Sequence, residues 1–211
     1  HERFRRQRQM CIRDSFQTRD LSGFGCDELS LAIAAAGCLL DYVKDTQRNE
    51  LPHLTSIRHE RQSDSVILDA ATRRNLEIDL NLHGGEDNTL FSVYNSTVTA
   101  MGTRHLKRWL HRPVRVRSVL EDRLDAVSRL AQNYAFETTR QALKPISDLE
   151  RILARVALRS SRPRDLTRLR DSLWALPALV RATPQDTNLL QALQSDIGQY
   201  PELCELSLIH I

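Results

Sequence analysis

The stretch "AMGTRHLKRWLHRPV" at residues 100–114 carries the pattern that decides the fold. Leu106 and Trp109 recur at the spacing of one side of a helix. Arg104 and Arg108 fall nearly opposite them, because successive residues turn by about 100° in a helix. The stretch therefore predicts an amphipathic helix with one apolar side and one arginine-rich side.

The helical pattern continues toward the C-terminus. Pro113 predicts the end of the first helix, since a proline disfavours helical backbone in the residue before it. Ser118 with Glu121, and Ser147 with Glu150, have the spacing of capping boxes and predict two helix starts. Both starts are followed by apolar stripes that are expected to face inward, namely Leu120, Leu124, Val127 and Ala131 after the first and Leu149, Ile152, Leu153 and Val156 after the second. A further helical run is expected from Pro163, with Leu166, Leu169 and Leu173 facing inward, and another over residues 188–197, with breaks at Pro177 and Pro184.

Before residue 100 the pattern is mixed. Residues 21–48 read as a helix with small residues on its apolar side, ending near Asp45, whereas residues 54–68 are the best strand candidates. Asp69 is expected to cap a short helix, and either Asn88 or Thr89 the next one. The predicted fold class is mainly α, a helical bundle-like body with a short β element near residues 54–68.

Composition agrees with a packed soluble domain. Hydrophobic residues make up 41% and charged residues 27% of the 211 residues, and the net charge is +3. Four cysteines lack CxxC spacing, so free thiols in a reducing compartment are expected rather than a metal site. Because no apolar run reaches membrane-spanning length and no signal peptide opens the chain, a cytoplasmic location is expected.

Both ends look foreign to the rest. The chain begins with "HERFRRQRQM" and "CIRDS" and stops on "SLIHI", and neither end has a cap or a periodic pattern. Residues 1–15 and 207–211 are therefore expected to be non-native or disordered, and the remainder to be a fragment of a longer protein.

The sequence gives little indication of an enzyme. Phosphate-loop, GxSxG and HExxH motifs are absent. His83 with Glu86 and Asp87 could be imagined as metal ligands, but a loop histidine before helix-starting acids is the ordinary alternative. His105 and His111 have no carboxylate at helical spacing that would make either a catalytic base. No catalytic, metal or cofactor-binding residue is therefore assigned.

Two arginine-rich stretches are the only candidates for a binding site. Basic residues without an intervening acid follow one another between residues 101 and 117, and a second series runs from 151 to 170. Such faces could bind the DNA backbone, but arginine stems also cover apolar surface, and the heads could pair with acids elsewhere. The candidate DNA-backbone contacts are Arg104, Lys107, Arg108, Arg151 and Arg155.

Several long stretches resemble the MutS family of bacterial DNA mismatch-repair proteins. They are "LPHLTSIRHERQSDSVILDAATRRNLEI" (51–78), "GGEDNTLFSVYNSTVTAMGTRHLKRWLHRPV" (84–114) and "DLERILARVALRSSRPRDL" (148–166), in the family's order. "GFGCDELSLAIAAAGCLLDYVKDTQR" (23–48) resembles the end of the family's connector domain. The resemblance implies connector residues at 16–50 and the first half of the core, or lever, domain at 51–206.

The resemblance also implies a role for the chain. The lever of the family transmits between the DNA clamp and the ATPase, and ATP, Mg, mismatched double-stranded DNA, a homodimer and a partner such as MutL belong to the full-length protein. An autonomous basic helical module that binds duplex DNA non-specifically is the alternative. The family usually has proline where this chain has Ala100.

A set of signature residues follows from the same resemblance. Arg73, Arg74 and Asn75 are expected to supply donors at the junction of connector and lever, beside the capping Asp69, with Leu76 and Ile78 as apolar anchors. The full signature is Asp69, Arg73, Arg74, Asn75, Gly102, Trp109 and Pro113.

Overall fold

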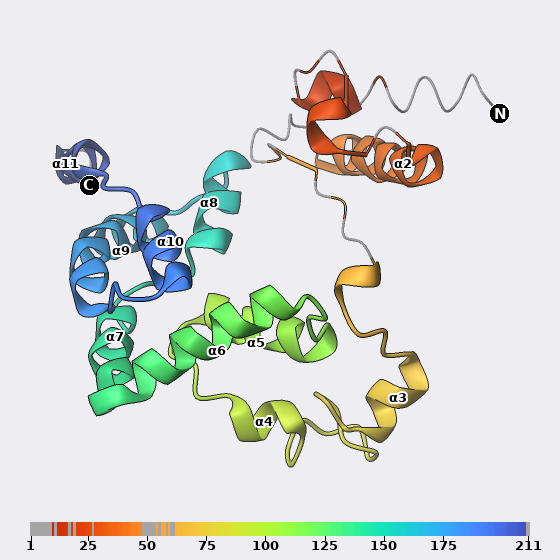
Figure 1. Ribbon diagram of the computed structural model, residues 1–211. Helices are drawn as coiled ribbons and strands as arrows, with labels where there is room; N and C mark the ends of the chain where they lie inside the picture. Colours follow the sequence, from red (N-terminus) through yellow and green to blue (C-terminus); the bar gives the residue numbers. More distant parts are fainter. Residues whose placement is uncertain are drawn as a thin grey trace. The chain divides into compact units, whose positions relative to one another are not determined.

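The computed structural model describes residues 10, 12–16, 18, 20–26, 28–47, 54, 56, 57, 59 and 62–209. It divides into two compact units, which are described separately. Unit 1 comprises residues 1–60 with 153–161, and unit 2 comprises residues 61–152 with 162–211. Helices dominate both units (Figure 1). Since an isolated bridge is the only β pairing among the described residues, the mainly-α prediction is confirmed.

An apolar cluster organises unit 1. It combines the helical residues 12–16, the 3-10 helix η1 (Ser22–Phe24) and the helix α2 (Ser30–Gln47). The helix α2 ends two residues beyond the predicted Asp45. The cluster's most buried members are Ile12, Leu21, Cys26, Ile33 and Leu40. Ile12 lies in the segment that the sequence analysis sets aside as foreign, yet its side chain is fully buried in this cluster.

Unit 2 begins with the 3-10 helix η2 (Gln62–Asp64) and one antiparallel bridge between Ser65 and Val114. The amide of Val66 donates to the carbonyl of Pro113 at 2.7 Å, and that of Arg115 to Asp64 at 3.0 Å. The strand predicted near residues 54–68 is therefore reduced to this bridge in the part of the stretch that the structure describes. A ladder cannot extend further, because residue 114 belongs to the short connection between two helices.

Two short helices follow, each with a side-chain cap. The carboxylate of Asp69 accepts from the amide of Thr72 at 2.6 Å and starts α3 (Ala70–Asn75), as predicted. Thr89 starts α4 (Leu90–Tyr94) through a reciprocal capping box with Ser92 and is 1% exposed, so Thr89 rather than Asn88 is the cap. Both caps satisfy backbone donors that a helix start leaves free.

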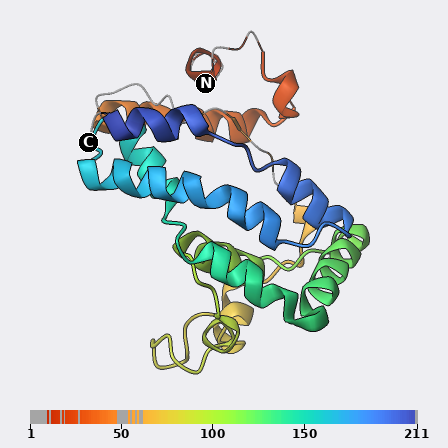
Figure 2. The same cartoon turned by 90° about the vertical axis from the view of Figure 1, so that its left-hand side faces the viewer.

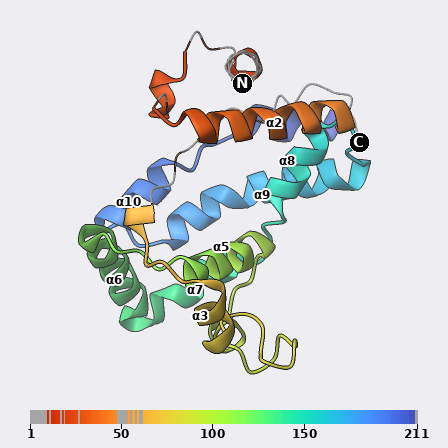
Figure 3. The same cartoon turned by 90° about the vertical axis from the view of Figure 1, so that its right-hand side faces the viewer.

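Longer helices form the body of unit 2, in which α7 packs on α6 and α9, α10 on α6, and α11 on α9. Figure 2 shows α11 running back alongside α9, and Figure 3 shows α3 and the loop after it at the end of the unit away from α9. These elements are α5 (Ala100–His111), α6 (Arg117–Ala131), η3 (Gln132–Tyr134), α7 (Ala135–Leu143), α8 (Leu149–Ala157), α9 (Pro163–Ala182), α10 (Asn188–Ser195) and α11 (Pro201–Ile209). The helix α8 begins in unit 2, and its residues from Leu153 onward belong to unit 1.

The predicted helix starts after residue 115 need correction. The helix α6 begins at Arg117 after Val116, which provides no side-chain cap, so the predicted capping box of Ser118 and Glu121 is wrong. Ser118 is the second residue of the helix instead of the residue before it, so Ser118 and Glu121 do not occupy the two positions of a capping box. At α8 the carboxylate of Asp148 accepts from the amide of Arg151 at 3.3 Å, so Asp148 caps this helix in place of Ser147.

The helix α9 begins with Pro163 in its first turn, as predicted, but continues through Pro177 to Ala182. The predicted break at Pro177 is therefore wrong. A proline removes one hydrogen bond of the helix, and α9 remains continuous there while it packs on α7 and α11. A further helix, α11, was not predicted and runs through residues 207–209, which the sequence analysis sets aside.

Several predicted apolar stripes remain partly uncovered. On α6, Leu124 and Val127 are 66% and 61% exposed. On α8, Ile152 is buried at 2% exposure, but Leu153 is 51% exposed, so its predicted inward position is wrong. Val156 on α8 and Leu166 on α9 are also exposed, contrary to the predicted stripes.

Candidate functional site

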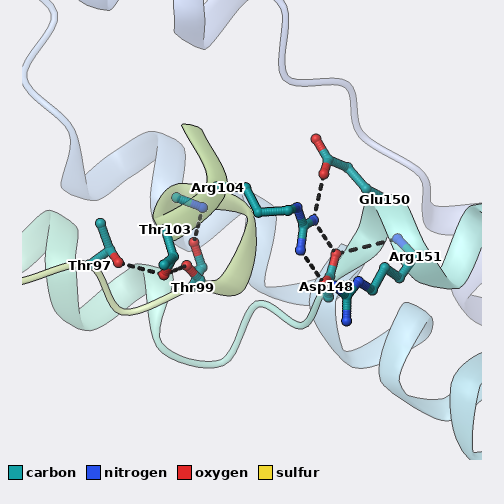
Figure 4. A network of polar contacts seen from close by, with 8 residues as sticks. Thr97, Thr99, Thr103, Arg104, Asp148, Glu150 and Arg151 are labelled. Atoms are coloured by element: carbon teal, nitrogen blue, oxygen red, sulfur yellow. Dashed lines mark hydrogen bonds and ion pairs between the residues drawn. The ribbon is translucent and has the colours of Figure 1, made fainter. Parts of the chain in front are cut away.

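The first turn of α5 is built by three threonines. The hydroxyl of Thr99 accepts from the amide of Gly102 at 3.1 Å, and the hydroxyls of Thr97 and Thr103 lie 2.7 Å apart (Figure 4). A Cβ added at Gly102 would lie 3.0 Å from the Thr99 hydroxyl oxygen, so glycine leaves room for this cap. Ala100 occupies the first position of the helix without a side-chain polar group.

Arg104 projects from this turn to the start of α8, where it binds two acids (Figure 4). Its two terminal nitrogens donate to the two carboxylate oxygens of Asp148, each at 2.7 Å. One of them also donates to Glu150 at 2.5 Å. We call Arg104, Asp148 and Glu150 the Arg104 clasp. It joins residues 44 and 46 positions apart in the sequence, and its bidentate geometry is typical of strong guanidinium–carboxylate pairs.

The clasp changes the acidity of its members. The hydrogen bond from Arg104 lowers the pKa of the Asp148 carboxyl, and the amide of Arg151 lowers it further against the effect of burial. The hydrogen bonds to Asp148 and Glu150 raise the pKa of the Arg104 guanidinium. Both charged forms are therefore favoured together, and the clasp persists at neutral pH.

The remaining candidate DNA contacts lie in different environments. Arg151 is 69% exposed and its guanidinium lies 3.5 Å from the Asp148 carboxylate. Arg155 is half-buried, and Arg108 is exposed. The basic residues predicted as possible DNA-backbone contacts in two series are therefore partly engaged by acids of the chain itself, while Arg108 is exposed.

Lys107 belongs to a second polar cluster, which links α5 to the loop after α3. Its ammonium lies 3.2 Å from Asp79 and 5.3 Å from the centre of the Phe91 ring, and the imidazole Nε2 of His111 lies 3.1 Å from the same Asp79 oxygen. Burial by itself would raise the pKa of the Asp79 carboxyl, but hydrogen bonds from His111 and Lys107 outweigh it and lower that pKa. The cluster places a carboxylate between two basic groups of one helix.

Trp109 joins α5 to α6. The guanidinium of Arg123 stacks 3.9 Å from the centre of its ring, and the His105 ring lies 5.0 Å from it. Burial lowers the pKa of His105, and the charges of Arg108 and Arg123 lower it further. At 39% exposure Trp109 is less buried than an apolar stripe implies, and its ring binds the Arg123 cation.

The other signature residues divide between local structure and the surface. Asp69 is the observed cap of α3, and the carbonyl of Pro113 accepts in the bridge region. Ile78 is buried at 2% exposure, but Leu76 is 57% exposed and does not anchor. The side chains of Arg73, Arg74 and Asn75 are exposed, with no hydrogen bond or ion pair to any described residue of unit 2. Their junction role stays a prediction without a partner in that unit.

Further polar links between helices were not predicted. Arg129 on α6 pairs with Asp186, just before α10. The hydroxyl of Thr139 on α7 donates to the carbonyl of Ala182 at 3.0 Å. The fully buried Ser172 accepts from the amide of Ser147 at 2.9 Å. No sequence signal marks these pairs, since their members lie 25 to 57 residues apart.

Neither a metal centre nor a membrane span is found in the part of the chain that the structure describes. His83 and its acidic neighbours are among the residues searched, and no group of three or more potential metal ligands converges there. No helix within the described ranges is long and apolar enough to cross a bilayer. Cys38 and Cys204 are free thiols, the thiol of Cys26 donates to the carbonyl of Leu21 at 3.9 Å, and Cys11 lies outside the described residues.

The arrangement defines a class: a helical scaffold whose charged side chains tie helices to one another. Comparison with family models identifies it further. The model of MutS domain III matches residues 71–209, and that of MutS domain II matches residues 2–55. The chain therefore belongs to the MutS family of DNA mismatch-repair proteins. The matched ranges include residues 2–15 and 207–209, which the sequence analysis sets aside as foreign.

Proposed function

We propose that unit 2 is the lever of an ATP-dependent mismatch-binding protein and transmits between its DNA clamp and its ATPase. The observation that carries the proposal is the Arg104 clasp, a bidentate ion pair across 44 residues that fixes the start of α8 to α5. Transmission requires elements that move as rigid bodies, and such elements need no catalytic group of their own.

The pairing of basic side chains with carboxylates of unit 2 supports the same proposal. Arg104, Lys107 and Arg129 each contact a carboxylate from a distant part of unit 2. Basic side chains that bind a DNA backbone must be free to replace its counterions, and these three are already engaged. They act instead as connections between helices.

The remaining expectations concern the full-length protein to which we propose this chain belongs. In that protein ATP and Mg would bind to an ATPase domain, and mismatched duplex DNA, a second copy and MutL would be the partners. This segment would contribute no catalytic residue and bind no cofactor itself. A cytoplasmic location would follow from its role on chromosomal DNA.

The lever proposal is tested by uncoupling. The measured quantity is the ratio of the mismatched-DNA dissociation constants with and without ATP in the full-length protein. Arg104→Met should make this ratio smaller by about 2- to 30-fold. DNA affinity without nucleotide and the basal ATPase rate should stay within about twofold, because neither site contains Arg104. Arg108→Met, which removes an exposed charge from the same helix, is the matched control. An unchanged ATP effect in Arg104→Met would contradict the proposal.

The alternative is an autonomous module that binds the backbone of duplex DNA. The exposed Arg108 favours it, as does the 69% exposure of Arg151, although Arg151 also lies 3.5 Å from Asp148. Titration of the 211-residue chain with a labelled duplex at increasing salt separates the two functions. A module would bind with an affinity that falls steeply with salt concentration, whereas the lever would show negligible binding at every salt concentration.

A further inference from the structure

A cavity of about 590 Å³ opens beside α3, and none of its lining residues belongs to the Arg104 clasp. Its volume lies within the range of sites that accept a small ligand or a protruding side chain. Residues from α3, from the loop after it and from the end of α5 contribute to its wall. The lining residues include Leu68, Arg73, Arg74, Leu80, Leu82 and His111.

The wall of the cavity is mostly apolar. Leu80 and Leu82 line it and are 50% and 56% exposed, and Leu76 nearby in the sequence is 57% exposed. Exposed leucines close together on one short segment are unfavourable in water and mark surfaces that bind another molecule. The loop is ordered by its own polar contacts, because Glu77 accepts from the amide of Leu82 at 2.7 Å and Asn81 from that of Gly85 at 2.8 Å.

The charge of the wall is positive. Arg73 and Arg74 are exposed, and their side chains have no acidic partner among the described residues. The one carboxylate in the wall, Asp79, is already bound by Lys107 at 3.2 Å and His111 at 3.1 Å. The Nδ1 atom of His111 is buried and has no hydrogen-bond partner. Two guanidinium groups beside an apolar cavity are complementary to a carboxylate attached to an apolar body.

We propose that this cavity is a docking site for a polypeptide segment that contains leucine and acidic residues. A leucine side chain of the segment would lie between Leu80 and Leu82, and a carboxylate would pair with Arg73 and Arg74. The apolar wall favours a polypeptide over a DNA backbone, because phosphates and sugars provide no aliphatic side chain to fill it. The site uses none of the residues of the Arg104 clasp and does not depend on the lever proposal.

Fluorescence anisotropy with labelled octapeptides tests the site on the 211-residue chain. The probe alternates leucine and glutamate, and two controls replace glutamate by lysine or leucine by serine. The leucine–glutamate peptide should bind at least about tenfold more tightly than either control, since each control removes one half of the recognition. Equal binding of the lysine peptide, or equal binding of the serine peptide, would overturn the proposal.

Variants locate the binding. Arg73→Gln with Arg74→Gln should weaken the leucine–glutamate peptide by about tenfold, and Leu82→Ser should do so by about threefold to tenfold. The charge-matched control is Arg164→Gln with Arg168→Gln, and the apolar control is Leu193→Ser, all exposed residues away from the cavity. Circular dichroism verifies that each variant is folded. Since Arg73, Arg74 and Leu82 are exposed, loss of folding is not expected, and binding that survives both changes would overturn the proposal.

Discussion

Unit 1 and unit 2 are held together by different forces. In unit 1 the described core is an apolar cluster, in which Ile12, Leu21, Ile33 and Leu40 are buried and the rings of Phe16 and Phe24 lie 5.5 Å apart. In unit 2 the helices are joined by ion pairs and by single hydroxyl groups, with α6 leaving much of its apolar stripe exposed. Burial of apolar side chains stabilises a fold without a preferred direction, whereas hydrogen-bonded ion pairs fix the orientation of the two segments that they join. The helices of unit 2 are therefore held in fixed orientations by polar links more than by a large apolar core.

The largest expected effect tests the apolar half of the comparison. Ile33→Ala, at a position 5% exposed in unit 1, should lower the free energy of unfolding by about 2–4 kcal/mol, because it removes buried methyl groups and leaves a cavity. Urea unfolding followed by far-UV circular dichroism measures it. Leu39→Ala on the same helix, at 63% exposure, is the control and should cost less than about 0.5 kcal/mol. Equal losses would show that the cluster is not the core of unit 1.

A smaller effect is expected where one hydroxyl joins two segments of unit 2. Ser172→Ala should lower the free energy of unfolding by about 1–3 kcal/mol, because it removes the buried hydroxyl oxygen that accepts from the half-buried amide of Ser147 at 2.9 Å. The same urea titration measures it, with the exposed helical Ser128→Ala as the control. A loss no larger than that of Ser128→Ala would mean that this link does not hold unit 2 together.

The ion pair of the clasp should contribute less than a buried group. Asp148→Asn keeps a side chain that can cap α8 but removes the charge, so the expected loss at neutral pH is about 1 kcal/mol for a carboxylate that is 19% exposed. Asp125→Asn on α6, an exposed acid, is the matched control. Urea unfolding at low and high salt distinguishes the two, since only the loss in Asp148→Asn is large enough to shrink measurably when salt is added.

The pH dependence of stability provides a second test of the Arg104–Asp148 ion pair. Arg104 lowers the pKa of the folded-state Asp148 carboxyl, so its stabilisation is complete above the unfolded-state pKa of about 4 and is lost as pH falls through the lower folded-state pKa. The difference in unfolding free energy between the native chain and Asp148→Asn should be constant from neutral pH down to about pH 5 and vanish in stronger acid. Thermal unfolding across this pH series measures it. A difference that grows on acidification would contradict the assignment.

The smallest effect is expected on the uncovered stripe of α6. Leu124→Gln, at 66% exposure, should change the free energy of unfolding by less than about 0.5 kcal/mol and should reduce self-association measured by sedimentation. Ala126→Gln, at 5% exposure on the same helix, is the opposite control and should destabilise. A large loss in Leu124→Gln would mean that the stripe is covered and that unit 2 has a fuller apolar core than its exposure indicates.

Local features were predicted well from the sequence because their causes lie within a few residues. The cap Asp69, the end of α5 before Pro113 and the start of α9 at Pro163 all depend on backbone geometry that neighbouring residues impose. The mistaken caps differ from the observed ones by one or two positions. The break predicted at Pro177 was wrong for another reason: α9 packs on α7 and α11, and tertiary packing of this kind is not readable from the residues around the proline.

The sequence by itself predicted most of the helices and the family, since periodicity and long matching stretches are properties of the chain order, but it did not predict α7 or α11. Only the tertiary structure decided which charges meet. Arg104 could have bound a phosphate or any acid of the chain, and its partners became Asp148 and Glu150 because the fold brings the start of α8 to α5. The same holds for the cavity beside α3, where Arg73 and Arg74 remain without an acidic partner in unit 2. Side-chain pairing over tens of residues depends on distance in space, which sequence separation does not encode.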